Sequence, residues 1–443
     1  MGNFYNNWNN MVTIMKKLGV LMGVLLLFIV GGTGCSSKQE FSEEYDPNTD
    51  YQYTYVDTFD GNRKVQYGNG GEYIWYNDFI YFYNEESKAL NPLCNKVNCL
   101  HDHEMDEDRL KECNAYTGMQ SGDNYVAISY YDDNVYFVKD GTLYRISQNG
   151  SKKDAIYTLE DEVPIYAWII HRGVLYYDTQ EYYSPDGEKV CTKVSFKRIE
   201  LSSHMSEKKA ETIFESDESV SVLTLSSLRA YKNVLYFKVI ARDNNKSSDG
   251  TEDGWVKALN NSYFYYNLET KELNEIEIPD GYGEYADISE IIFLNEKVLI
   301  RICDETLEQE YKFPVLYANY DMSNMAIWME ELEQGKSIQV NGDKVVISDA
   351  DIQYFEKENK NSIHVSVYDT NAKCIDTFIY PLNNMGNLCG SGVNGELLEI
   401  IDDDSNWYIY GFNLNSIGNY NGKEVKLELK STRKIGTLNN LEE

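Results

Sequence analysis

The stretch NVYFVKDGTLYRISQNGSKK, residues 134–153, decides the fold. It contains two runs in which apolar and aromatic residues alternate with polar ones, and a turn rich in Asp, Asn, Gly and Lys follows each run. Alternation with a period of two is typical of a half-buried strand, and short polar turns between such runs are typical of antiparallel hairpins. The stretch therefore predicts two neighbouring strands of one antiparallel sheet.

The same phrase, a polar turn followed by an alternating and often Tyr-rich strand, recurs along the chain. Its seven copies are YNDFIYFY (76–83), YDDNVYFV (131–138), HRGVLYYD (171–178), YKNVLYFKV (231–239), LNEKVLIRI (294–302), NGDKVVIS (341–348) and VNGELLEII (393–401). A second strand follows most copies, as in GTLYRISQNG (141–150), NSYFYYNLET (261–270), SIHVSVYDTN (362–371) and NWYIYGFNLN (406–415). Repeats of this kind, in a chain without a convincing amphipathic helix pattern, are typical of a β-propeller.

We therefore expect an all-β chain with a single β-propeller over residues 51–443. Seven blades fit the repeats best, and six or eight are alternatives. A set of stacked β-sandwich domains is the competing architecture, because its strands also alternate. The segment VKLELKS (425–431) is a candidate closing strand, pairing with the first blade or with residues 51–59.

The N-terminal residues have the order of a bacterial lipoprotein signal. Lys16 and Lys17 precede an apolar run over residues 18–30, and the small-residue sequence GGTGCSS follows, with Cys35 where a lipoprotein is cut and lipidated. The apolar run has 13 residues, fewer than the roughly 20 that a membrane-spanning helix needs. An ordinary secretory signal, with Cys35 left as a plain thiol, is the alternative.

We expect residues 1–34 to be a lipoprotein signal peptide and residues 35–50 to be a lipid anchor and flexible tether. Cys35 would carry a diacylglyceryl group with palmitate-type chains, which would hold the protein on the extracytoplasmic face of the cell membrane. Whether translation starts at Met1, Met11 or Met15 stays open, because a more ordinary signal peptide begins at Met15.

The charge balance excludes one class of partner. The chain has 40 basic and 72 acidic residues, a formal net charge of −32, and removal of residues 1–34 would make it −34 because they contain two lysines and no acids. So acidic a surface repels the phosphates of nucleic acids, and we expect no nucleic-acid binding. The acids are spread among aromatic and β-branched residues, which indicates a folded body.

Three features together resemble a group of known proteins. They are TGCSS around Cys35, the stretch over residues 134–153, and NPLCNKVNCLHDHE (91–104) with the later Cys113. The chain thereby resembles the extracytoplasmic lipoproteins of clostridial-type bacteria that carry WD-like or Tol-type β-propeller repeats. This resemblance implies a propeller outside the cytoplasm, and it implies no particular activity, since the group has none that is settled.

One compact group of residues has the chemistry of a metal site. Cys94, Cys99, His101, His103 and Cys113 follow the pattern C-x4-C-x-H-x-H-x9-C, within a Cys/His-rich loop over residues 91–116. Thiolate and imidazole ligands suit tetrahedral zinc, which can hold together a loop that has little core of its own. We expect Cys94, Cys99, His101 and Cys113 to be ligands of a structural zinc ion, and His103 could replace His101.

Two other interpretations of the same residues stay open. A disulfide among Cys94, Cys99 and Cys113 is natural for an exported protein and would leave one of the three thiols over. Lipidation of Cys35 leaves seven cysteines, so full pairing within one chain is impossible. The third interpretation is a reduced loop without metal.

The sequence contains no P-loop, no G-x-S-x-G elbow and no H-E-x-x-H motif, so no residue is assigned a catalytic role and the ligand-binding residues are unknown. We therefore favour a non-catalytic binding or scaffold module for a protein, peptide or glycan. The alternative is a propeller-type polysaccharide hydrolase or lyase, because propeller sites are assembled from distant loops. A redox or metal-handling module at Cys94 to Cys113 is a third class.

Overall fold

In the computed structural model, residues 43–443 form one compact unit. The structure describes residues 44–46, 48–52, 64–101, 106–119, 126–159, 167–184, 191–202, 205, 209–217, 220–243, 259–283, 285–294, 296–304, 306–308, 311–341, 343–348, 362–381, 387–388, 396–402, 406–413, 416, 418–425 and 428–434. The predicted signal peptide over residues 1–34, the predicted lipidation site Cys35 and the alternative ligand His103 lie outside the described residues. Within the described part of the chain, no helix is long and apolar enough to cross a membrane.

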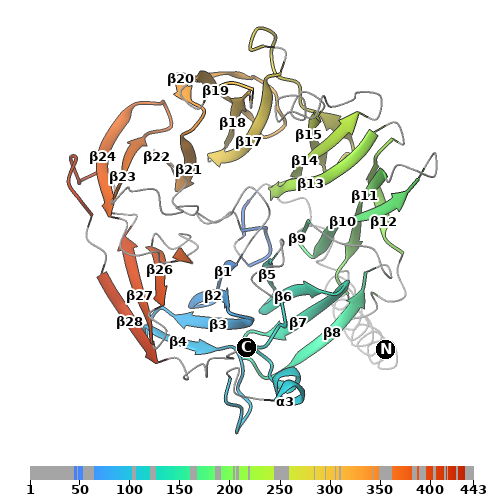
Figure 1. Ribbon diagram of the computed structural model, residues 1–443, viewed down its shortest axis with the longest axis vertical. Helices are drawn as coiled ribbons and strands as arrows, with labels where there is room; N and C mark the ends of the chain where they lie inside the picture. The colour runs from blue at the N-terminus through green and yellow to red at the C-terminus, as the bar shows by residue number, and fades with distance from the viewer. Residues whose placement is uncertain are drawn as a thin grey trace, which may run out of the picture. The chain divides into compact units, whose positions relative to one another are not determined.

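The described strands form seven four-stranded antiparallel sheets, and each sheet consists of four strands that are consecutive in the chain. The sheets follow one another around a ring, with the first strand of each sheet at the inner side (Figure 1). The protein is thus an all-β propeller, which confirms the predicted fold class.

The strands of the first four sheets are β1 (Val65–Gly68), β2 (Gly71–Tyr76), β3 (Phe79–Asn84), β4 (Ala89–Pro92); β5 (Ile128–Tyr131), β6 (Asn134–Lys139), β7 (Thr142–Ser147), β8 (Lys153–Thr158); β9 (Trp168–His171), β10 (Val174–Tyr183), β11 (Cys191–Glu200), β12 (Glu211–Glu215); and β13 (Val220–Tyr231), β14 (Val234–Asp243), β15 (Leu259–Asn267), β16 (Leu273–Glu275). The last three sheets contain β17 (Asp287–Leu294), β18 (Lys297–Cys303), β19 (Lys312–Asn319), β20 (Ala326–Glu333); β21 (Ser337–Asn341), β22 (Lys344–Ser348), β23 (Ser362–Tyr368), β24 (Cys374–Pro381); and β25 (Asn387–Leu388), β26 (Glu396–Asp402), β27 (Asn406–Asn413), β28 (Glu428–Lys434). One short helix, α3 (Glu107–Glu112), lies between the first and second sheets in the chain.

The repeated phrase marks the same structural position in six of the seven sheets, namely the turn between the first and second strands. In the second sheet this turn is Asp132–Asp133, with φ of 47° and 57°, the left-handed values that a two-residue hairpin turn requires. The first copy differs, because YNDFIYFY contains the turn between β2 and β3. In the first sheet the turn between the first two strands is Asn69–Gly70, which precedes the aromatic strand β2 and is not one of the seven predicted copies.

Among the described residues, the candidate closing strand does not pair with the first sheet, and most of its alternative partner, residues 53–59, lies outside them. β28, which contains most of the candidate closing segment 425–431, pairs with β27 and is the outermost strand of the last sheet. Among the described residues, no strand of the last sheet pairs with the first sheet. The described contacts between the sheets are therefore made by side chains and by connecting segments.

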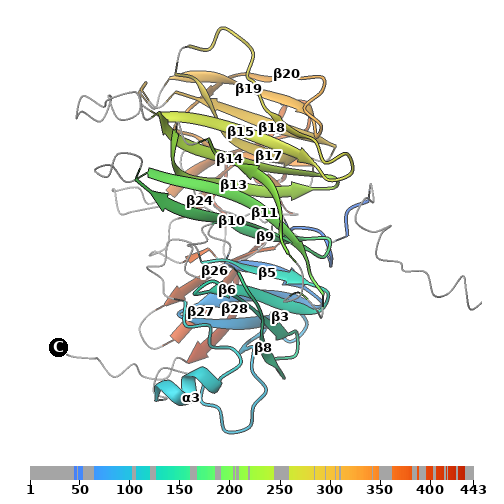
Figure 2. The ribbon, with the colours of Figure 1, turned by 90° about the vertical axis from the view of Figure 1, so that its right-hand side faces the viewer.

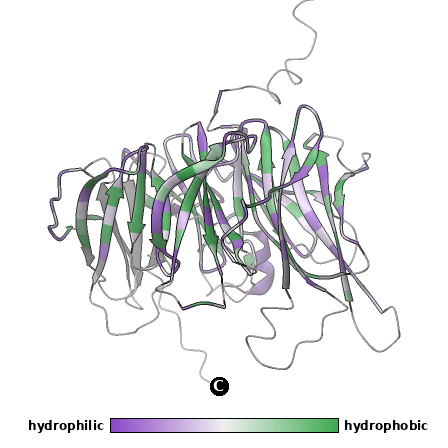
Figure 3. Ribbon diagram, turned by 90° about the horizontal axis from the view of Figure 1, so that it is seen from above, coloured by the Kyte–Doolittle hydropathy of each residue, from purple (hydrophilic) through white to green (hydrophobic). Residues whose placement is uncertain are grey.

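The core lies between neighbouring sheets, where the apolar residues of each alternating strand face the next sheet. Figure 3 shows this alternation of apolar and polar residues along the strands. Aromatic pairs join successive sheets, as between Tyr73 and Tyr130, with ring centroids 5.4 Å apart, and between Phe196 and Phe237, 4.7 Å apart. Such ring pairs stabilise a contact beyond the area they bury.

Candidate metal centre

The predicted metal ligands lie in the connection between β4 and β5, which we call the metal loop (described residues 93–101 and 106–119). The loop and its helix α3 are at the outer rim of the ring, beside β4 of the first sheet and β8 of the second (Figure 1). Cys94 follows the end of β4 by two residues, and Cys99 ends a turn in which its N–H donates to the carbonyl of Lys96.

The remaining thiol of the cluster is positioned by α3. Asp106 caps the start of the helix, since its carboxylate accepts the N–H of Arg109 at 3.0 Å. Leu110 is the buried residue of the helix, and it fixes the helix against the first sheet. Cys113 follows the last turn as the C-cap, so its side chain is set by the helix end.

The structure brings together the four side chains that the sequence singled out. One ligand atom from each of Cys94, Cys99, His101 and Cys113 can be chosen so that all four lie within 4.8 Å of one another. The sulfur of Cys113 is 3.6 Å from Nδ1 of His101. In a tetrahedral zinc site, bond lengths of about 2.3 Å to sulfur and about 2.0 Å to nitrogen put these two atoms about 3.5 Å apart. The donor set and its spacing fit a tetrahedral ion.

The three cysteines of the cluster are free thiols in the structure. They differ in surroundings, because Cys113 is fully buried whereas Cys94 and Cys99 are partly exposed. Burial raises the pKa of the Cys113 thiol to about 12, and the negative charge of a Cys94 thiolate adds to this rise. A bound divalent cation would reverse that effect, since it stabilises the thiolate form of each ligand.

The thiol of Cys94 has a lowered pKa, in contrast to that of Cys113. Burial by itself raises the pKa of Cys94, but hydrogen bonds, led by those from the backbone of Lys96 and Asn114, together bring the pKa below the ordinary value. Hydrogen bonds from the thiols of Cys113 and Cys99 act in the same direction. The loop therefore stabilises one negative charge before any ion is bound.

The turn between β7 and β8 of the second sheet supports the metal loop from outside. The carbonyl of Gly150 accepts hydrogen bonds from Nδ2 of Asn114 at 2.8 Å and from the N–H of Asn95 at 3.2 Å. Gly150 has φ +69°, and a Cβ added there would lie 2.7 Å from the backbone nitrogen of Cys94. Only glycine allows the two backbones to approach so closely.

Lys153, the first residue of β8, places a positive charge beside the cluster. Its Nζ donates to the carbonyl oxygens of Cys113 at 2.6 Å, Tyr116 at 2.8 Å and Lys111 at 3.3 Å. A zinc ion with three thiolates and one imidazole has a net charge of −1, which this ammonium would balance. The roles of Gly150 and Lys153 were not predicted from the sequence, although both residues belong to the QNGSKK turn (148–153) that follows the predicted strand.

Four protein ligands would complete a tetrahedral site and leave no position for water or substrate. Catalytic zinc sites in proteins have three protein ligands and one open position, whereas structural sites have four. Among the described residues, this is the one group of three or more Cys, His, Asp or Glu side chains that could hold a metal ion. The arrangement is that of a structural metal centre.

Comparison with models of protein families finds no match for this chain, and comparison with curated protein sequences finds none either. Solved structures resemble the fold only distantly. An oligogalacturonate lyase in complex with manganese has 11% sequence identity and a TM-score of 0.46, covering 81% of this chain and 88% of that one. A prolyl endopeptidase has 14% identity and a TM-score of 0.48, and prolyl oligopeptidase B from Galerina marginata has 12% and 0.43.

Each of these two peptidases covers 91% of this chain, which spans 52% and 54% of their respective lengths. At these identities the similarity concerns the fold alone.

Proposed function

We propose that the protein is a lipoprotein held on the extracytoplasmic face of the cell membrane by lipid on Cys35. Its propeller would be a non-catalytic binding or scaffold module for a protein, peptide or glycan. The observation that supports a non-catalytic role for the metal centre is the closed four-ligand cluster, which is the one metal-ligating group within the described residues and leaves no position for a substrate at the metal. The resemblance of TGCSS and the propeller repeats to clostridial-type lipoproteins supports the location.

The cluster itself would hold a zinc ion with a structural role. Zinc suits three thiolates and one imidazole in tetrahedral geometry, and its binding energy would add to the stability of the metal loop. The segment of the loop between Cys94 and His101 has little apolar core of its own, since Val97 and Leu100 are 89% and 53% exposed. A bound ion would therefore replace the core that this segment lacks.

Metabolic labelling with an alkyne analogue of palmitate tests the anchor. We expect label on the wild-type protein in the membrane fraction, and no label on the Cys35→Ser variant. A matched Cys374→Ser variant, which changes a cysteine of β24 in the propeller, should be labelled as the wild type is. An unlabelled wild-type protein would refute the anchor.

Arrays of glycans and peptides test the binding role on the domain without its signal, residues 36–443. We expect a ligand that binds saturably and is recovered unchanged after prolonged incubation. New reducing ends or unsaturated sugar products from a bound polysaccharide would instead identify a hydrolase or lyase. Repeating the incubation with a chelator separates a reaction that needs metal from one that does not.

Native mass spectrometry tests the zinc site on protein purified without chelator. We expect one zinc ion per chain, lost in Cys99→Ser and retained in the control Cys374→Ser. The wild-type chain without metal, lighter by two hydrogen atoms that map to Cys94, Cys99 or Cys113, would show a disulfide in place of the metal.

A further inference from the structure

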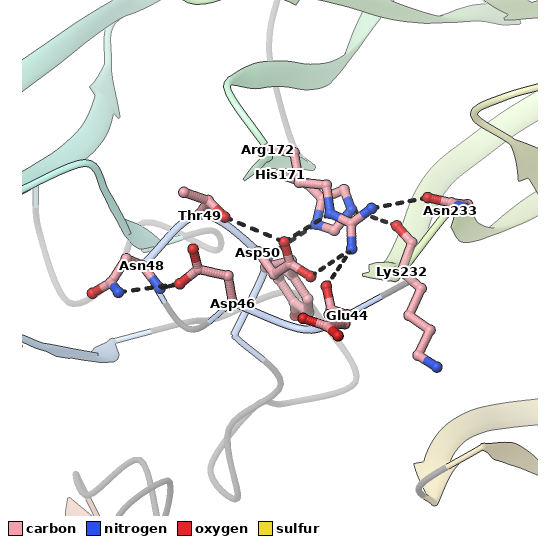
Figure 4. Close-up of polar contacts among 10 residues, drawn as sticks. Glu44, Asp46, Asn48, Thr49, Asp50, His171, Arg172, Lys232 and Asn233 are labelled. Atoms are coloured by element: carbon pink, nitrogen blue, oxygen red, sulfur yellow. Dashed lines mark hydrogen bonds and ion pairs between the residues drawn. The ribbon is translucent and has the colours of Figure 1, made fainter. Parts of the chain in front are cut away.

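A short N-terminal segment, residues 44–46 and 48–52, lies near the centre of the ring (Figure 1), and we call it the strap; its polar contacts are drawn in Figure 4. Asp50 forms a two-point ion pair with the guanidinium of Arg172, at 2.7 Å from Nε and 2.9 Å from Nη2. Both side chains are nearly inaccessible to solvent, at 1% for Arg172 and 2% for Asp50. Nη1 of the same guanidinium donates to Oδ1 of Asn233 at 2.8 Å.

Backbone contacts extend this attachment over several sheets. The N–H of Arg172 donates to the carbonyl of Thr49 at 2.6 Å, and the N–H of Asp132 donates to the carbonyl of Asn48 at 3.2 Å. The N–H of Tyr51 donates to Nδ1 of His171 at 2.9 Å, which leaves the other ring nitrogen, Nε2, to donate to the carbonyl of Lys232 at 2.8 Å. Further along, Oε1 of Gln52 accepts the N–H of Tyr67 in the first sheet.

All these contacts lie on one face of the ring. They involve the turns between the first and second strands of the second, third and fourth sheets, and the end of β1 next to the equivalent turn of the first sheet. Because neighbouring strands are antiparallel, the turns between second and third strands lie at the opposite ends of the strands. We name the two sides the strap face and the loop face; in Figure 2 the strap is at the right-hand side, on the strap face.

The strap fixes where the chain leaves the propeller. An attachment through a buried, fully paired ion pair resists release, because separating the partners leaves a charge without its partner in the interior. Any lipid on Cys35 is nine residues before Glu44, and nine residues span at most about 30 Å. The strands β10, β11, β13 and β14 have 10 to 12 residues, which corresponds to lengths of about 33 to 40 Å.

A tether of that reach cannot pass around the ring to the loop face. We infer that the protein sits on the membrane with its strap face toward the lipid surface and its loop face directed outward, as the face open to ligands. This inference rests on the proposed lipidation of Cys35. It makes the bilayer surface the partner of the strap face.

The distribution of charge favours the same orientation. Among the described residues between the strands, those in connections that start and end on the strap face (first to second and third to fourth strands) have a net formal charge of −3. Those in connections between second and third strands, or from one sheet to the next, have a net charge of −7. Anionic lipid headgroups therefore repel the loop face more strongly, within about a Debye length of the surface.

Energy transfer on vesicles tests the orientation with the full lipidated chain. A donor dye is attached through a noncanonical amino acid at Asp343, in the turn between β21 and β22 on the strap face, or at Asp140, in the turn between β6 and β7 on the loop face. Both are exposed turn residues. The vesicles contain phosphatidylcholine, one-fifth phosphatidylglycerol and a small amount of acceptor-labelled lipid. We expect the higher transfer efficiency from position 343.

Releasing the strap should abolish that difference. The double variant Asp50→Ala with Arg172→Ala removes both charges together, so that no unpaired ion is left in the interior. The segment between Cys35 and the first strand then lengthens, and the transfer efficiencies from the two positions should converge. As a control, Lys238→Met with Asp287→Leu removes a pair in the fourth and fifth sheets, away from the strap, and should leave the difference intact.

The possible failures are distinguishable. Equal efficiencies from the two positions, or a higher one from position 140, in protein that floats with the vesicles would overturn the orientation and leave the anchor standing. Wild-type protein that does not float with the vesicles would refute the lipid anchor and, with it, the orientation.

Discussion

The strap and the metal loop both tie neighbouring sheets together, but they do so with different chemistry. The strap is complete without any added group, because Asp50 and Arg172 neutralise each other in the interior. The metal loop gathers three thiols and one imidazole, and the thiolate forms of the three cysteines repel one another until a cation joins them. The stability of the strap's attachment should therefore depend on pH, whereas the stability of the metal loop should depend on bound metal and on the oxidation state of its cysteines.

The two regions matter because the described strands leave the ring without a closing strand. Among the described residues, β28 pairs only within its own sheet. The sheets are therefore held together by contacts between neighbours and by segments that bond to more than one sheet. The strap bonds directly to the first three sheets and reaches the fourth through Arg172 and His171, and the metal loop joins the first two sheets. A substitution in the strap or in the metal loop, followed by a measurement on the other region, shows whether the two act independently, as expected for sites without shared partners.

The largest effect should come from breaking the strap on one side only. Arg172→Met leaves the Asp50 carboxylate buried without its partner and should lower the free energy of unfolding by about 3–5 kcal/mol. Urea unfolding measures the loss, and zinc content measured on the same samples should not change. The control Arg145→Met removes a partly exposed pair with Asp154 and should cost less than about 1 kcal/mol. Similar losses in the two variants would contradict the strap.

Acid should weaken the strap before it protonates most carboxylates. Burial is the main cause that lowers the pKa of His171 to about 4, from 6.5 for an exposed imidazole. The unfolded chain therefore binds a proton that the folded chain refuses between these two values, so stability falls as the pH drops from about 6.5 to about 4, by about 3 kcal/mol in total. The free energy of unfolding, measured at pH 7 and pH 4.5, should show the drop.

Two variants isolate this effect. His171→Gln, whose amide can accept from Tyr51 and donate to Lys232, should show a smaller decrease between the two pH values. The exposed His364 is the control, and His364→Gln should behave as the wild type does. All variants are compared in a Cys99→Ser background, because thiolate ligands also release metal in acid. Equal pH dependence with and without His171 would exclude it as the cause.

Gly150→Ala should damage the metal loop through its backbone contact. The added Cβ would lie 2.7 Å from the nitrogen of Cys94, in a residue with φ +69°, and crowding together with backbone strain should cost about 1–3 kcal/mol. Gly70→Ala is the matched control, since Gly70 has φ +82° and nothing within 4 Å of the added atom. The unfolding temperature and the zinc content should both fall more in Gly150→Ala than in Gly70→Ala. Equal losses would mean that backbone strain at a positive φ, and not the contact with Cys94, is the cause.

The difference between the strap and the metal loop also explains which features could be predicted from the sequence. The repeats predicted the propeller because each strand alternates with a period of two, and alternation is a local property. The metal ligands were predicted because all four fall between Cys94 and Cys113, so their proximity in sequence indicated their proximity in space. The metal site could therefore be predicted without knowing how the sheets are arranged around the ring.

The strap could not be predicted in this way. Asp50 stands 122 positions before Arg172, in a polar segment whose composition is typical of a tether. Arg172 and Lys232 occupy turns of the repeated phrase, and the sequence identifies a turn without showing what lies against it. The pairing depends on the closed ring, which brings the turns of separate sheets to one face.

The smallest expected effect concerns the charge beside the metal. Lys153→Met retains most of the buried side chain but removes the ammonium that three carbonyls of the metal loop bind. Residues that support metal ligands from outside typically change metal affinity 10–100-fold, and we expect weakening in this range. Competition with a chromophoric chelator measures the affinity. The adjacent Lys152→Met, whose ammonium pairs with Asp154 at the surface, should leave it unchanged, because that charge lies on the solvent side. Equal affinities for the two variants would show that the net charge of the site is balanced by solvent, and Lys153 would then contribute packing alone.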